Sequence, residues 1–153
     1  MRYLPALYRL VAAALLGAQL FFAAVAAQKV FPKEVAALPR SEPRRTLAAD
    51  LVGQMLGPLD AATMVGGALC VGLAVLLWRS GAGSLRAALP PLLAALCAAA
   101  SAYGTTPAIQ AMRAAGATGE PRFGMLHGLS SSLLLLEMAL LLWAALRTLQ
   151  RSL

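Results

Sequence analysis

The sequence predicts an all-α membrane protein with four transmembrane helices and a short interfacial amphipathic helix between helices one and two. Of its 153 residues, 60% are hydrophobic and 12% are charged, and the mean hydropathy is +0.74. The apolar residues gather in four runs of about 20, which is the length that crosses roughly 30 Å of hydrocarbon. Because lipid satisfies no backbone polar group, these runs must be helices. Residues 1–153 are expected to form a single domain.

The first expected span covers residues 4–27. Its beginning, Arg2 and an apolar run that ends in AVAAQK, imitates a cleavable secretory signal. The apolar stretch is longer than the core of a usual signal, so we interpret it as a retained first helix. Ala13 and Gly17 make a small-xxx-small step that suits close contact with another helix.

Residues 32–60 form the only sizeable polar region. Thr46 suits the N-cap of a short helix over residues 47–56, whose apolar side chains fall on one stripe. Gly57 and Pro58 are expected to end this helix before the second span. The pattern predicts an amphipathic helix that lies in the interface or against the bundle.

The remaining spans are expected at residues 61–78, 85–103 and 124–146. Several glycines in the second span allow a neighbouring helix to approach closely. The third span is expected to end near Tyr103, because the segment 105–107 contains a proline that breaks a regular helix.

The net charge of +7 does not indicate a nucleic-acid partner. The basic residues flank the apolar runs, where they meet lipid headgroups, and they are not interleaved with aromatic residues along a stripe. Four spans place both termini on one side, with Arg2, Arg9, Arg79, Arg86, Arg147 and Arg151, against Lys29, Lys33, Arg40, Arg44, Arg45, Arg113 and Arg122 on the other. The first group lies in shorter segments, so we expect cytoplasmic termini and a location in a bacterial inner membrane.

Four polar or polarisable side chains fall near mid-membrane, at Gln19, Cys70, Cys97 and Glu137. An ionisable group at that depth costs roughly 2.5–3.5 kcal/mol on insertion scales, so it faces the bundle and has a partner. One interpretation of Glu137 is a proton or cation relay, or a ligand group together with the thiols. The other is a neutral carboxyl that is hydrogen-bonded to Gln19 or to a hydroxyl of the third helix and holds the helices together.

His127 is the only histidine and lies about one turn into the fourth span. Ser130 and Ser131 follow three and four residues later, a spacing that suits a hydrogen-bonded packing contact with another helix. A nucleophilic serine–histidine pair is not expected, because no third orienting group is present. No nucleotide-binding or zinc-protease motif occurs either, so we expect no enzyme.

Metal or haem ligation is the alternative interpretation of His127, because imidazole is the commonest metal ligand. One histidine cannot form a bis-histidine haem site within one chain, so a methionine such as Met125 would supply the second axial ligand. Cys70 and Cys97 complete the candidate metal ligands, although buried thiols are by default small hydrophobic residues. No cofactor is predicted first, and haem or copper is kept as the alternative.

The motif FGMLHGLSS at residues 123–131 resembles the signature of the family named after mammalian transmembrane protein 205. The stretches GAQLFFAAVA, LVGQMLGPLDAAT and SAYGTTPAIQAMRA agree with it in order, over nearly the whole chain. The resemblance implies a four-span membrane protein and little about activity. Ser101 and Leu134 stand where the family pattern leads us to expect asparagine, so a polar network built on those asparagines is reduced here.

The sequence therefore predicts a non-enzymatic bundle that binds a partner protein, a lipid or a small molecule, with a contact organised by His127, Ser130 and Ser131. Its small size and smooth helix faces suit a homo-oligomer or a subunit of a larger membrane complex in the lipid bilayer. The alternatives are a haem- or copper-binding membrane protein and a small transporter.

Overall fold

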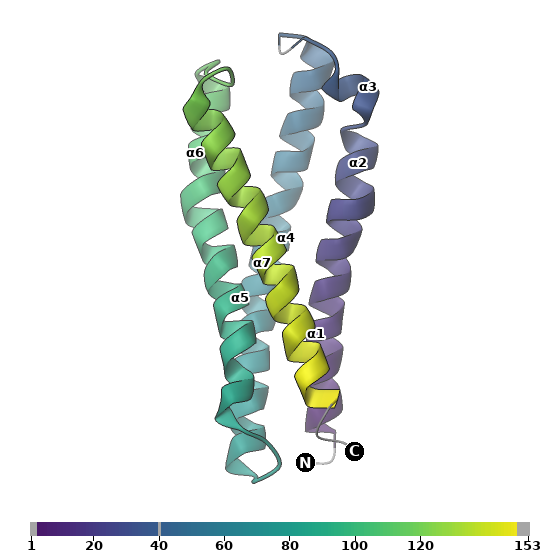
Figure 1. The fold of residues 1–153 in the computed structure, drawn as a ribbon, viewed down its shortest axis with the longest axis vertical. Helices are drawn as coiled ribbons and strands as arrows, with labels where there is room; N and C mark the ends of the chain where they lie inside the picture. Colours follow the sequence, from purple (N-terminus) through teal and green to yellow (C-terminus); the bar gives the residue numbers. More distant parts are fainter. Residues whose placement is uncertain (1–2, 40, 150–153) are drawn as a thin grey trace.

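A computed structural model describes residues 3–39 and 41–149, and the secondary-structure elements in these ranges are all helices (Figure 1). Within these ranges, four helical segments are long and apolar enough to cross a membrane: Leu4–Val30, Pro43–Arg79, Leu85–Ala114 and Pro121–Leu146. The all-α class and the four spans are thus confirmed, and the chain is an integral membrane protein.

The first span contains three successive helical pieces. These are α1 (Leu4–Phe21), a π-helical turn η1 (Phe22–Ala26) and α2 (Ala27–Val30). In the π-helical turn the amide of Ala27 donates to the carbonyl of Phe22, five residues earlier. After the first span a short helix, α3 (Lys33–Ala36), leads toward the second span.

The second span belongs to one continuous helix of 37 residues, α4 (Pro43–Arg79). The separate amphipathic helix over residues 47–56 was a wrong prediction, since this segment is the first part of α4 and the helix continues through Pro58. Proline removes one amide donor, but membrane helices tolerate that loss where neighbours support the chain. Buried residues lie on both sides of the proline, at Ala48 and Asp60. Packing therefore supports α4 on both sides of the proline.

The third span also continues farther than its sequence predicts. It contains η2 (Leu85–Ala88), α5 (Leu89–Ala100), a π-helical turn η3 (Ser101–Thr105) and α6 (Thr106–Ala114). The expected break after Tyr103 does not occur. The proline at position 107 directly follows the π-helical turn η3, and the wider π-turn accommodates a residue that has no amide hydrogen. The fourth span is in α7 (Pro121–Leu149).

The four spans form a ring in which α1 packs on α4, α4 on α5, α5 on α7, and α7 on α1 (Figure 1). The start of α1 and the end of α7 lie at one end of the bundle, together with the turn between α4 and η2. We call this the lower end, as in Figure 1. The upper end contains α3, the start of α4, α6 and the start of α7.

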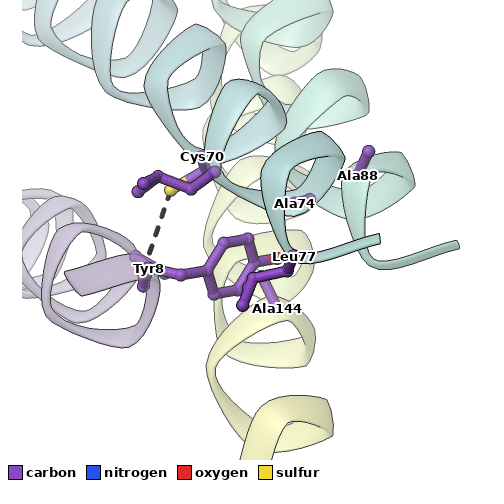
Figure 2. Packing of buried hydrophobic residues seen from close by; sticks show 8 residues of the cluster. Tyr8, Cys70, Ala74, Leu77, Ala88 and Ala144 are labelled. Atoms are coloured by element: carbon purple, nitrogen blue, oxygen red, sulfur yellow. Dashed lines mark hydrogen bonds between the residues drawn. The ribbon is translucent and has the colours of Figure 1, made fainter. Parts of the chain in front are cut away.

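The lower half of the bundle has an apolar core of mostly small side chains. Its members are Tyr8, Ala12, Cys70, Leu73, Ala74, Leu77, Ala88 and Ala144 (Figure 2). The Tyr8 hydroxyl donates a 2.8 Å hydrogen bond to the carbonyl of Ala87. In α4, just before Cys70, a Cβ on Gly67 would lie 2.9 Å from the carbonyl oxygen of Pro91. The absence of a side chain at Gly67 is therefore what lets α4 and α5 approach.

The orientation of the bundle in the membrane stays a prediction. Arg2, Arg40 and Arg151, which enter the charge comparison between the two sides, lie outside the described residues.

Candidate functional site

Five polar side chains meet inside the bundle, and all four spans contribute to them. We call this set the polar core cluster: Gln19 of α1, Asp60 and Thr63 of α4, Ser101 of η3 and Glu137 of α7. Gln19, Glu137 and Asp60 are 0%, 1% and 2% exposed. In lipid, ionisable groups inside a bundle mark functional sites by default, because their burial is costly.

Gln19 is the centre of the hydrogen bonding in the cluster. Its Nε2 donates to Glu137 Oε2 at 2.7 Å and to Thr63 Oγ1 at 3.0 Å. The Thr63 hydroxyl in turn donates to the carbonyl of Leu59 at 3.0 Å. An amide nitrogen carries two hydrogens, so both are used, and they join α1 to α7 and to α4. Gln19 and Glu137, both singled out from the sequence, are thus brought together.

Asp60 lies beside this hydrogen-bonded chain. Its side chain is hydrogen-bonded with Ser101, and its carboxyl is close enough to Glu137 for the two to interact electrostatically. Among the described residues, Asp60 Oδ2 and Gln19 Oε1 are buried and have no hydrogen-bond partner. Both atoms are acceptors. The cluster therefore has more buried acceptors than donors.

Asp60, Thr63 and Ser101 are the cluster residues that the sequence argument missed as a site. The sequence places Asp60 in the polar segment before the second span, because Pro58 is expected to end a helix there. Had the helix been extended through that proline, Asp60 and Thr63 would have fallen three residues apart on one face.

Both π-helical turns lie next to the polar core cluster. One begins at Phe22, three residues after Gln19, and the other begins at Ser101 itself. Such turns are rare and frequently occur at functional sites. Their positions give a second indication that this level of the bundle is specialised.

The structure does not bring His127, Ser130 and Ser131 together in one contact. His127 is exposed on the outside of α7, and its ring stacks on Phe123 with centroids 6.3 Å apart. Ser131 is also exposed, and its hydroxyl donates to the carbonyl of His127 at 3.0 Å. Ser130 is buried. With about 3.6 residues per turn, Ser130 turns into the bundle while the other two face outward.

The outside of α7 also carries a row of small residues. Gly124, Gly128 and Ser132 recur every four residues and are exposed. A Cβ on either glycine would meet no atom within 4 Å, and the Ser132 hydroxyl donates to the Gly128 carbonyl of its own helix at 2.9 Å. We call these three residues the α7 outer stripe.

The candidate metal ligands lie in different parts of the bundle. Cys70 is in the lower apolar core, with its sulfur 3.9 Å from the carbonyl oxygen of Tyr8 (Figure 2). Cys97 is half-buried near Glu137, whereas Met125 is exposed on α7. In the described ranges, no three His, Cys, Asp or Glu side chains are grouped to hold a metal ion. The haem or copper alternative stays a prediction.

The fold defines the class of protein, a four-helix integral membrane bundle with a polar core. Comparisons with protein-family models, with curated proteins and with solved structures found no match for this chain. The resemblance to the family of transmembrane protein 205 therefore stays a prediction.

Proposed function

We propose that the protein is a non-enzymatic membrane bundle that works as a homo-oligomer, with two copies joined along the α7 outer stripe. The observation that carries this proposal is the position of Gly124 and Gly128. They are spaced for helix contact, and nothing in the same chain lies within 4 Å of a Cβ on either of them.

Small residues mark contacts between helices in a membrane because the surrounding solvent is lipid. Lipid tails are as apolar as leucine, so helices associate in membranes through close packing of small residues and through polar contacts. Inside the chain, Gly67 is used in this way against α5. Gly128 costs α7 about 1 kcal/mol of helix propensity relative to alanine and supports no contact within its own chain. A contact with another helix accounts for it.

A second copy of the chain is the partner that the stripe fits best. The three residues are uncharged, and a row of small residues on a helix is complementary to the same row on a second helix related by two-fold symmetry. His127 lies on the same outward side as the stripe. In such a pair its ring would lie beside the interface between the two copies.

The test is the oligomeric state of the full chain in lipid bilayers, measured by single-molecule photobleaching over a range of protein-to-lipid ratios. We expect dimers, and Gly128→Leu should weaken the dimer about tenfold, near 1.4 kcal/mol. Gly72→Leu is the matched control, because Gly72 is also exposed with open space around it, on α4, but has no second glycine four residues away. A wild-type chain that stays monomeric at every ratio would overturn the proposal.

A further inference from the structure

We propose that the polar core cluster is an exchangeable proton-binding site, in which Asp60 and Glu137 hold protons between α4 and α7. This inference goes beyond the homo-oligomer and does not depend on it. It concerns the inside of the bundle, where the two carboxyls and the two acceptors without partners lie together.

The charged residues inside the spans indicate that the cluster holds a proton. No lysine or arginine occurs in residues 10–28, 46–78, 87–112 or 123–146. The two carboxyls are buried to 98% or more, and no cationic side chain among the described residues is their partner. Two ionised carboxylates close together in a medium of low dielectric constant repel strongly. The cluster therefore holds at least one proton.

We place that proton on Asp60. Gln19 Oε1 and Asp60 Oδ2 are both acceptors without a partner in the described chain. Thr63 follows Asp60 by three residues on the same face of α4 and accepts from the Gln19 amide, so Asp60 and Gln19 face the same volume. A proton on Asp60 Oδ2 makes this atom a donor, for which Gln19 Oε1 is the free acceptor. One proton thus satisfies both atoms.

Glu137 is the carboxyl that exchanges its proton. Glu137 Oε2 accepts the Gln19 amide at 2.7 Å, whereas Asp60 Oδ2 has no donor among the described residues, so we assign the remaining negative charge to Glu137, because a hydrogen bond to a carboxylate favours its ionised form. On loading, Glu137 gains one proton and an O–H bond forms on its carboxyl; the proton comes from hydronium at the membrane surface, which is left there as water. The charge of the carboxyl pair then changes from −1 to 0, and unloading reverses these steps.

Few other groups can titrate at this level. The α1 and η3 segments contribute Gln19 and Ser101, which do not ionise. From α5, the half-buried thiol of Cys97 interacts electrostatically with Glu137. Tyr8 and Cys70 belong to the lower apolar core. The protons of the cluster in the described structure are therefore those of the carboxyl pair, with Cys97 as the neighbour to control.

The ligand set suits a proton better than a metal ion. Hard metal ions take about six oxygen ligands, whereas the cluster has two buried acceptors without partners. All five cluster residues are buried. A proton needs only one donor atom and one acceptor, so it fits this closely packed site.

The test is infrared spectroscopy of the reconstituted full-length protein, which reports the carbonyl stretch of protonated carboxyls. Between about pH 6 and about pH 9, exposed carboxyls are ionised. In this range we expect a protonated-carboxyl band that shifts in D2O and loses intensity as the pH rises. A band that neither shifts in D2O nor changes with pH would show a fixed structural carboxyl and overturn the proposal.

Variants assign the band. Glu137→Gln should remove the part that depends on pH, and Asp60→Asn should remove the part that persists at high pH. Glu34→Gln, at an exposed carboxyl, is the control and should change neither part, while Cys97→Ala should leave the dependence on pH in place. If a core variant does not fold, the wild-type spectra in H2O and D2O still decide. A band that decreases when sodium chloride replaces choline chloride at constant ionic strength would indicate an alkali cation and overturn the assignment to a proton.

Discussion

The polar core cluster and the α7 outer stripe are two contrasting regions that meet in one helix, α7. Glu137 faces inward, is almost fully buried and is hydrogen-bonded to Gln19. Gly124 and Gly128 face outward and have no neighbour in the chain within 4 Å of a Cβ. Because lipid gives little drive for apolar burial, a membrane helix joins its neighbours through polar pairs and small residues. Helix α7 thus uses a polar pair on its inward face and presents small residues on its outward face.

The largest expected effect is on the stability of the bundle, when leucine replaces a glycine that faces inward instead of one that faces outward. Gly67→Leu should destabilise the bundle by about 3 kcal/mol or more, because a Cβ there already lies 2.9 Å from the Pro91 carbonyl oxygen and from the Ala95 methyl. Gly72→Leu adds the same bulk on the outside and should change stability by less than about 0.5 kcal/mol. Reversible unfolding in mixed detergent micelles measures both. Equal losses would contradict the inward–outward distinction.

A smaller effect is expected from the central amide of the cluster. Gln19→Leu leaves the Glu137 carboxyl without its donor and should cost about 1–3 kcal/mol of unfolding free energy. Gln54 is exposed on α4, so Gln54→Leu is the matched control for the same change of side chain. If the two variants unfolded alike, the cluster would contribute nothing to the stability of the bundle.

The four spans could be predicted because hydrocarbon requires long apolar helices. The exact course of the helices could not, since whether Pro58 ends a helix depends on what its neighbours bury. Spacing also shows which residues of a helix share a face but not which face points inward. The spacing therefore predicts a shared contact for His127, Ser130 and Ser131, whereas the structure shows that Ser130 is buried and His127 is exposed. The partnership of Gln19 with Glu137 could be foreseen, because a buried carboxyl needs a donor and few were available at that depth.

An intermediate effect is expected at the upper end, where the polar contacts are partly exposed. Arg113 of α6 donates to the carbonyl of Ala49 at 2.9 Å and lies 3.7 Å from the Asp50 carboxylate. Because surface ion pairs contribute little, Arg113→Gln should cost about 0.5–1 kcal/mol in unfolding experiments. Arg122→Gln, at an exposed arginine of α7, is the control. A loss above about 2 kcal/mol would show that the upper end stabilises α4 as strongly as the polar core does.

The smallest effect on the stability of the monomer is expected from a substitution of His127. The same substitution tests which face of α7 points inward and which points outward. His127→Leu should change the unfolding free energy of the monomer by less than about 0.5 kcal/mol, because the ring is exposed and packs on Phe123 of its own helix. The dimer fraction in bilayers should fall, since a polar side chain beside the stripe is lost. A large loss of monomer stability with an unchanged dimer fraction would place His127 in the inward region, and the assignment of outer and inner faces of α7 would then be wrong.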